Sequence, residues 1–350
     1  MAYSTITKPS DYFNTKLYTA TGSAQSITGV GFQPDFVWIK DRESSGWHFW
    51  TDAVRGATKT IFSNSTSGES TETGGLTAFG TDGFSIGTHT NINTNGNNIV
   101  AWNWKANGLG SSNTDGSINT TYTSVNTTAG FSICKWAGSG ANATIGHGLG
   151  VAPKVIITKS MASSTSWCFY HASLGNTKTL FLESNGTGNT HVAYYNNTSP
   201  TSSVFSVGTD SGVNHSGNDM IAYCFAEKKG YNKFDSYKGN GNADGTFVYT
   251  GFKPAFVIIK DTTTGGGGHS WCLWDNKRST FNPTTKLLLP NATDTEYTLT
   301  DPIDFLSNGF KIRDNNGSRN DNGSTYIYMA FAENPFVANV GANGVPATAR

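Results

Sequence analysis

The sequence GFQPDFVWIK, at residues 31–40, occurs in three versions along the chain. The second reads GVAPKVIITK at residues 150–159, and the third reads GFKPAFVIIK at residues 251–260. Each is a Gly-x-x-Pro turn followed by an apolar run that ends in a lysine. A short apolar run bounded by a turn is typical of a β-strand buried on both faces. The pattern therefore predicts one such strand in each of three copies of a common motif.

Three further landmarks follow each of these strands in the same order: a tryptophan strand, a Phe-x-aliphatic strand and a closing aromatic strand. They lie at 47–50, 84–86 and 100–104, then at 167–170, 205–207 and 221–225, then at 271–274, 310–312 and 327–331. From the first copy to the second, the offsets are 119 at the proline, 120 at the tryptophan and 121 at the later phenylalanines. From the second to the third they are 101, 104, 105 and 106. Offsets that drift this little predict an internal repeat.

The composition favours short strands joined by tight turns. The chain of 350 residues contains 41 glycines, and charged residues make up only 14%. We predict an all-β protein of three tandem β-sandwich (jelly-roll) domains. The predicted boundaries are repeat 1 at 1–106, a Gly/Ser/Asn/Thr-rich linker at 107–130, repeat 2 at 131–229, repeat 3 at 230–336 and a C-terminal tail at 337–350.

Turn residues precede the closing strand of each copy. They are Asn95-Gly96, Ser216-Gly217 and Asn322-Gly323, and Asn-Gly suits a type I′ hairpin. The stretch DNNGSRNDNGS at 314–324 superficially resembles a calcium loop, but it lacks the alternating oxygen ligands and closing glutamate of an EF-hand. We predict a turn there, with a calcium ion bound in it as the alternative.

Charge and cysteine content exclude several classes of protein. The 24 basic and 24 acidic residues balance, whereas nucleic-acid binding normally requires an excess of basic residues. No apolar stretch is long enough for a membrane span, and residues 1–11 do not read as a signal peptide. Cysteines occur singly within apolar runs, at Cys134, Cys168, Cys224 and Cys272. We expect buried free thiols and no zinc site.

The sequence contains no recognisable catalytic group. Asp52 with Arg55 and Asp275 with Arg278 recur at a spacing of three, which predicts an ion pair that pins a turn; the alternative is a carboxylate with an electrostatic helper. The second copy has His171 at this position, so the spacing is not a shared catalytic device. The seven histidines do not cluster, and we expect structural roles for them. Catalytic, cofactor and metal residues are predicted to be absent, and ligand-binding residues cannot be assigned.

Aromatic residues have two possible roles, packing and ligand stacking. Trp47, Trp167 and Trp271 recur at one position of the repeat, which favours packing. Five others are less constrained by the repeat and could face a ligand, although a core position is the stronger expectation: Trp50, Trp102, Trp136, Tyr194 and Tyr195.

Several segments resemble a domain of structural and tail-fibre-like proteins from marine tailed phages. They are GFQPDFVWIK at 31–40, GWHFWTDAVRG at 46–56, DGFSIG at 82–87, IVAWNW at 99–104, the junction at 113–132 followed by 146–159, and FVANVGANGVPATAR at 336–350. The resemblance covers nearly the whole chain. It implies lectin-like jelly-roll domains in a virion component and brings no catalytic residue with it.

The expected function is therefore that of a phage structural protein at the particle surface, either tail-fibre-like or spike-like or a decoration of capsid or tail. It would be assembled in the host cytoplasm and dock to other virion proteins, as a homo-oligomer or within a symmetric assembly, and it could attach to host-surface glycan. One alternative is a glycan-binding lectin-like module. The other is a polysaccharide depolymerase, which would need a pair of carboxylates that sequence spacing does not reveal.

Overall fold

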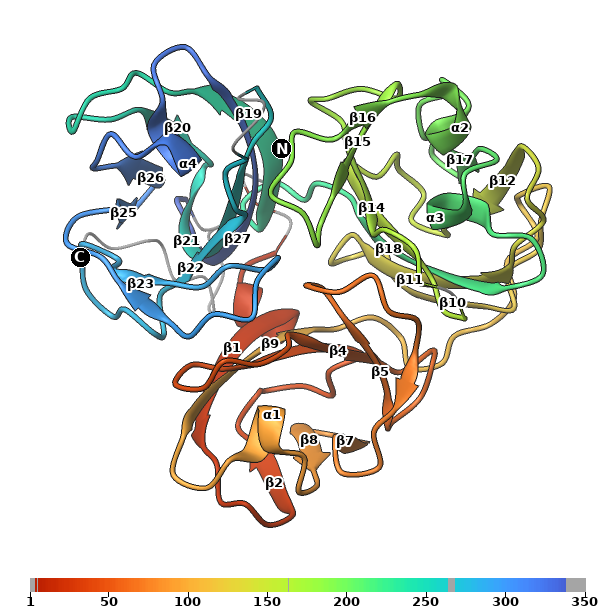
Figure 1. The fold of residues 1–350 in the computed structure, drawn as a ribbon, viewed down its shortest axis with the longest axis horizontal. Helices are drawn as coiled ribbons and strands as arrows, with labels where there is room; N and C mark the ends of the chain where they lie inside the picture. The colour runs from red at the N-terminus through yellow and green to blue at the C-terminus, as the bar shows by residue number, and fades with distance from the viewer. Residues whose placement is uncertain (1–3, 5, 163, 264–267, 338–350) are drawn as a thin grey trace.

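The computed structural model describes residues 4, 6–162, 164–263 and 268–337. Within these residues the protein is all-β, with antiparallel sheets packed as sandwiches, as predicted. Figure 1 shows three lobes around a common centre, and each lobe contains one copy of the sequence repeat. We refer to residues 13–104 as lobe 1, 122–225 as lobe 2 and 232–335 as lobe 3.

Lobe 1 pairs a six-stranded inner sheet, in the order β1-β9-β3-β4-β5-β6, with an outer sheet β2-β8-β7. Its elements are η1 (Pro9–Asp11), β1 (Phe13–Thr19), β2 (Gln25–Thr28), β3 (Phe36–Asp41), β4 (Phe49–Asp52), β5 (Lys59–Phe62), β6 (Ser70–Thr71), β7 (Leu76–Gly80), β8 (Gly83–Ile86), α1 (Thr90–Asn93) and β9 (Asn98–Trp104).

Lobe 2 has a seven-stranded inner sheet, in the order β10-β11-β18-β13-β14-β15-β16, and an outer pair β12-β17. Its elements are β10 (Tyr122–Asn126), β11 (Phe131–Ala137), β12 (Ala143–Gly146), β13 (Val155–Ser160), β14 (Cys168–His171), β15 (Lys178–Phe181), β16 (Asn189–Thr190), α2 (Val192–Tyr195), β17 (Val204–Val207), α3 (Ser211–Asn214) and β18 (Asp219–Phe225).

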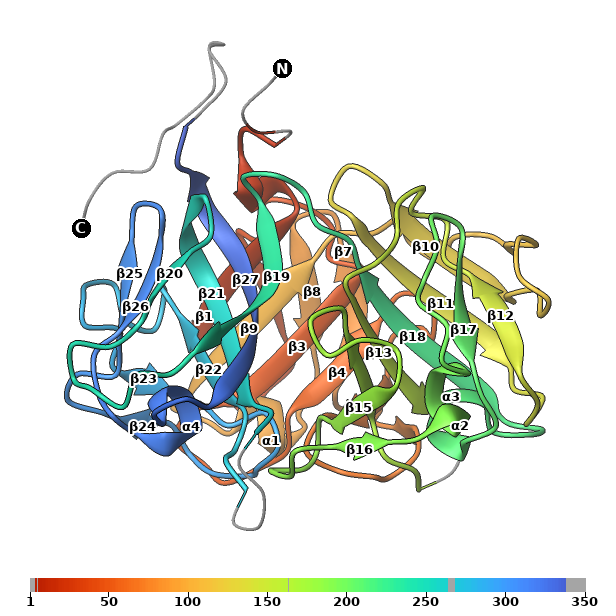
Figure 2. The same cartoon turned by 90° about the horizontal axis from the view of Figure 1, so that it is seen from above.

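Lobe 3 has the inner sheet β19-β27-β21-β22, the outer sheet β20-β26-β25 and a small pair β23-β24. Its elements are β19 (Asn232–Lys238), β20 (Phe247–Tyr249), β21 (Phe252–Asp261), β22 (Cys272–Asp275), β23 (Lys286–Leu287), β24 (Tyr297–Thr298), β25 (Ile303–Leu306), β26 (Gly309–Ile312), α4 (Gly317–Asn320) and β27 (Thr325–Pro335). Figure 2 places the start of β1 and the end of β27 at the same end of the molecule.

The strands that follow the Gly-x-x-Pro turns, β3, β13 and β21, are buried on both faces, as the apolar runs predicted. Successive side chains of a strand point to opposite faces. In β3, Phe36 and Trp38 therefore point toward the centre, while Val37 and Ile39 enter the core of their own lobe. The same alternation in β13 and β21 sends one face of each inner sheet into a single central core. This core is shared by the three lobes, and each lobe also has a core of its own.

Two details of the predicted connections are wrong. The segment at 107–130 is not entirely a linker, because it contains β10, which pairs with β11 at the edge of lobe 2. The turns before the closing strands are not type I′ hairpins, since only the glycine has positive φ, at +88° in Gly96. There the Asn97 amide donates to the Thr94 carbonyl, 3.0 Å away, after the short helix α1. A positive φ at the third position alone is the type II pattern. The predicted tail lies outside the described residues from 338 onward.

Candidate functional site

The three lobes meet at three equivalent contact regions, which we call seams. In each seam the end of one inner strand, β4, β14 or β22, faces the closing strand of the next lobe, β18, β27 or β9. The paired registers make Asp52, His171 and Asp275 equivalent to one another. They also make Trp102, Tyr223 and Met329 equivalent. Lobe 1 thus contacts lobe 2, lobe 2 contacts lobe 3, and lobe 3 contacts lobe 1.

The seam between lobes 1 and 2 is ionic. Asp52 Oδ2 accepts a hydrogen bond from Arg55 Nε at 2.5 Å and another from the Tyr223 hydroxyl of lobe 2 at 2.7 Å. Both charged side chains are fully buried. Burial raises the pKa of the Tyr223 hydroxyl well above its usual value, so this hydroxyl remains a proton donor. The predicted ion pair is confirmed, and besides pinning its turn it reaches the neighbouring lobe.

The seam between lobes 3 and 1 repeats this arrangement. Asp275 Oδ2 accepts from Arg278 Nε at 2.5 Å and from the Trp102 indole of lobe 1 at 3.0 Å. Arg278 also contacts Glu296 at 3.1 Å, and Glu296 receives two hydrogen bonds of 2.8 Å from Arg42 of lobe 1. Buried charges are tolerated when they are paired and hydrogen-bonded in this way.

The seam between lobes 2 and 3 has uncharged residues in place of the aspartate and arginine, and we call it the neutral seam. His171 replaces the aspartate, and its Nε2 lies 3.2 Å from the backbone carbonyl of Tyr328. Leu174 replaces the arginine and packs against the central core. The residue facing them from lobe 3 is Met329, whose side chain has no hydrogen-bond donor. Burial lowers the pKa of His171 to about 4, so the imidazole is uncharged at neutral pH.

The prediction that Trp47 occupies the same position of the repeat as Trp167 and Trp271 is wrong by one residue. The register aligns His48, and not Trp47, with Trp167 and Trp271. Trp167 and Trp271 are buried and donate to the Phe62 and Phe181 carbonyls of the preceding lobe. A shift of one residue moves a strand side chain to the other face, which leaves Trp47 41% exposed. His48 takes the seam position, where it accepts from the Trp38 indole at 2.9 Å.

The lysines that end the repeated apolar runs are buried, and two of them reach a neighbouring lobe. Lys40, Lys159 and Lys260 are completely buried, and burial lowers the pKa of each amine to about 8. Lys40 donates to the Thr293 carbonyl of lobe 3 at 3.4 Å, and Lys260 donates to the Asn185 carbonyl of lobe 2 at 3.1 Å. Lys159 donates within its own lobe, to the Ser160 carbonyl at 2.9 Å and the Thr165 hydroxyl at 3.3 Å. All three amines are buried and not accessible to a substrate.

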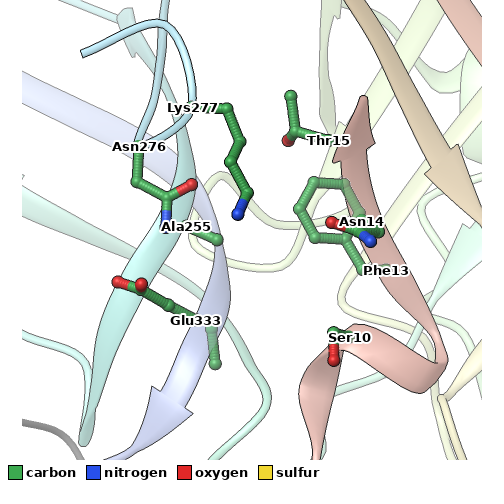
Figure 3. Close-up of a pocket in the computed structure, with 9 residues that line it drawn as sticks. Ser10, Phe13, Asn14, Thr15, Ala255, Asn276, Lys277 and Glu333 are labelled. Atoms are coloured by element: carbon green, nitrogen blue, oxygen red, sulfur yellow. The ribbon is translucent and has the colours of Figure 1, made fainter. Parts of the chain in front are cut away.

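A small polar hollow lies in the seam between lobes 3 and 1. Figure 3 shows Asn276 and Lys277 pointing into it from lobe 3 and Thr15 entering from lobe 1, while the Glu333 carboxylate at its border points away. Its volume is about 60 Å³, which exceeds the roughly 10–15 Å³ of such space that a water molecule needs. Thr15 and Asn276 are more than nine-tenths buried, and Thr15 Oγ1 and Asn276 Oδ1 have no hydrogen-bond partner within the protein.

The other two seams have no such polar set at the equivalent positions. Thr15 corresponds to Ile133 in lobe 2 and Phe234 in lobe 3, which are both buried in the central core. Asn276 and Lys277 correspond to Ala53 and Val54 in lobe 1. The fold therefore does not require polar residues here. Water or a small hydroxyl-bearing group in the hollow would supply hydrogen bonds to these two oxygens.

The remaining predicted candidates have structural roles. The five aromatic residues that could have faced a ligand are all buried, at 7% exposure or less, which confirms the core interpretation. The four cysteines are free and buried, as predicted. The stretch at 314–324 folds around α4, where Arg319 Nε donates to Asp314 at 2.8 Å.

His147 is buried between its own turn and the Thr201 carbonyl. The described part of the chain contains no group of three metal-binding side chains, and none of its helices has the length and apolar character to cross a membrane.

The outer face of lobe 3 differs from the outer faces of the other lobes. Phe247 and Tyr249 lie on the exposed side of β20. The equivalent residues are Ser26 and Thr28 in lobe 1 and Thr144 and Gly146 in lobe 2. Tyr249 also lines a hollow of about 390 Å³, together with Glu227, Lys229, Gly230, Asn232, Lys233, Thr250 and Gly251. No pattern in the sequence pointed to this site, because the landmarks of the repeat are core residues.

A family model described as "Domain of unknown function (DUF7483)" matches residues 8–335. The chain belongs to this family. The match runs from the start of lobe 1 to the end of lobe 3, so the family unit is the complete set of three lobes. No curated protein matches the chain. No solved structure matches it.

Proposed function

We propose that this DUF7483 protein is a non-enzymatic structural component of the surface of a bacteriophage particle, and that it makes its outward contacts through lobe 3. The observation that carries the proposal is the unequal distribution of exposed aromatic residues. Among the described residues, five of the six lie between positions 247 and 336: Phe247, Tyr249, Phe281, Tyr297 and Phe336, the sixth being Trp47. Lobe 3 thus exposes more large aromatic side chains than lobes 1 and 2, and exposed aromatic side chains are the kind of residue enriched in interfaces.

The chemistry of the interior supports a docking role. The most deeply buried carboxylates of the seams, Asp52 and Asp275, are each held by an arginine and by a donor from the next lobe. Both carboxylates are fully buried and engaged in these structural hydrogen bonds, so they are shielded from a substrate. The resemblance of the repeated segments to tail-fibre-like proteins favours a position in the virion.

Purified particles of a phage that encodes the chain provide the test. We expect mass spectrometry to detect the chain in stoichiometric amount and cryo-electron microscopy to place it at a fixed symmetric position, with lobe 3 at a contact surface. Absence of the chain from purified particles would refute the proposal. Presence with lobe 3 facing empty solvent in both free and host-bound particles would refute the role given to that lobe.

A further inference from the structure

We propose that the hollow beside Tyr249 binds a neutral sugar unit of a bacterial surface polysaccharide. The hollow lies where β20 turns into β21, next to the short connection that joins lobe 2 to lobe 3. Its volume of about 390 Å³ lies within the range of about 300–1,000 Å³ typical of sites for small ligands. The inference rests on the proposed function in one respect, namely that lobe 3 faces outward.

Tyr249 supplies an aromatic surface for stacking. Its side chain is 50% exposed, and Gly309, which lies opposite it on β26, has no side chain to cover the ring. Phe247 is on the same side of the strand two residues earlier and is also exposed. Thr28 and Gly146 occupy the position of Tyr249 in the other lobes. A large aromatic residue is therefore not needed to build this strand, and its presence in lobe 3 calls for another role.

The polar groups of the hollow favour hydroxyl groups over an ion. Lys229, Lys233 and Glu227 line it, and Asp235 lies 3.4 Å from the Lys233 ammonium. Two positive charges are thus accompanied by two negative charges, which removes the electrostatic preference for a charged ligand. A hydroxyl can donate to a carboxylate and also accept from an ammonium. Sugars combine such hydroxyls with an apolar ring face that stacks on an aromatic side chain.

The backbone around the hollow is held in place before any ligand binds. Glu227 Oε1 accepts from the Phe234 amide at 2.9 Å. Asn232 accepts from the Lys228 amide at 2.6 Å and donates to the Ala226 carbonyl at 3.1 Å. A preformed site loses less conformational entropy when it binds a ligand.

The direct test measures glycan binding by the purified full chain. We expect an array of defined oligosaccharides from bacterial surface polysaccharides, neutral and uronate-containing, to give signals with neutral members. Calorimetry with the best neutral oligosaccharide should then show binding at least about tenfold weaker for Tyr249→Thr, which introduces the residue of lobe 1. Phe281→Thr removes another exposed aromatic residue of lobe 3, outside the hollow, and should bind like the wild type. Unchanged thermal unfolding of both variants establishes that each is folded.

Three results would overturn the inference: no neutral oligosaccharide binds the wild type, Tyr249→Thr binds as tightly as the wild type, or only uronate-containing glycans bind with affinity that collapses as salt is raised. These outcomes are independent of the proposed function, which particle composition decides. A chain present in virions that binds no sugar loses only the present inference. A chain that binds neutral sugars through Tyr249 but is absent from virions loses only the proposed function.

Discussion

The two ionic seams and the neutral seam occupy equivalent positions but are built from different residues. In each seam, the residues of the turn differ together with the residue that faces them from the next lobe. Where the next lobe supplies a hydrogen-bond donor, from Tyr223 or Trp102, the facing turn contains an aspartate and an arginine. Where the next lobe supplies Met329, the turn contains His171 and Leu174. A buried carboxylate without donors would be costly. Each seam therefore specifies which lobe can follow it, and the copies are not interchangeable.

Among the changes considered, removal of lobe 3 should destabilise the protein most. A chain ending at residue 229 retains the ionic seam between lobes 1 and 2 and loses the other two. It also exposes one side of the central core, including Trp104 and Phe225, which pack against Phe331. We expect the cooperative unfolding transition to be lost and a hydrophobic dye to bind strongly. A monomeric fragment that unfolds cooperatively would show that the lobes are independent domains and that the seams contribute little.

Asp52→Ala should be the most damaging single substitution among the seam residues. It removes the carboxylate to which Arg55 Nε donates at 2.5 Å and leaves the buried guanidinium with only the more distant Glu69 carboxylate, 3.5 Å away. Loss of the close partner of a buried pair costs about 3–5 kcal/mol. His171→Ala, at the equivalent position of the neutral seam, should cost only about 1–2 kcal/mol, because no charge is left behind. Urea denaturation measures both values. The triple variant Asp52→His, Arg55→Leu, Tyr223→Met transplants the neutral seam and should recover most of the loss. Equal effects of the two alanine variants would contradict the distinction between the seams.

Acid should destabilise the neutral seam through His171. The pKa of His171 is about 4 in the folded protein and about 6.5 in an unfolded chain. The unfolded state therefore binds a proton first, and stability is lost as pH falls below about 6.5. At pH 5 the loss from this residue is about 2 kcal/mol. The pKa of His48 is also lowered by burial, so it adds to the effect. Denaturation at pH 7.5 and pH 5 should show a smaller difference for His171→Gln than for the wild type. An unchanged difference would exclude His171 as a source of the acid sensitivity.

Replacing the polar residues of the hollow should have the smallest effect, and it should raise the stability of the protein where the earlier changes lower it. Thr15→Ile, Asn276→Ala and Lys277→Val together copy the seam between lobes 1 and 2. We expect the variant to be more stable by about 1–2 kcal/mol, because two buried oxygens without protein partners are removed. Thermal unfolding measures the gain. The reverse change, Ile133→Thr, should be destabilising. A loss of stability in the triple variant would indicate that bound water already satisfies the hollow.

The sequence revealed the repeat and the buried strands because both depend on local patterns. Continuous apolar runs identified β3, β13 and β21, and the spacing of Asp52 and Arg55 identified an ion pair within one turn. The sequence did not reveal that alternate residues of these strands enter a core shared by three lobes. Nothing in a local pattern distinguishes the core of one lobe from a common core, since both select the same apolar residues.

Two errors had specific physical causes. The tryptophans were aligned by residue type, whereas the pairing of β3 with β4 aligns His48 with Trp167. Strand β10 lies in a segment rich in glycine, serine, asparagine and threonine, and its pairing with β11 was not visible in the composition. The sites of lobe 3 and the polar hollow depend on contacts between distant segments. Only the comparison of equivalent positions, once the registers were known, made them apparent.

The ring of lobes closes only when its last member is present. The ion pair between Arg42 and Glu296 joins residues 254 positions apart, and the strand that completes lobe 3, β27, is the last element of the described chain. During synthesis, the aromatic faces of the first two lobes therefore remain uncovered until residues 232–335 have been made. We expect the nascent chain to be vulnerable to aggregation and chaperone binding. The closed ring has no free end lobe from which unfolding can spread, unlike a linear array of repeats, so the finished protein should unfold slowly and resist proteases.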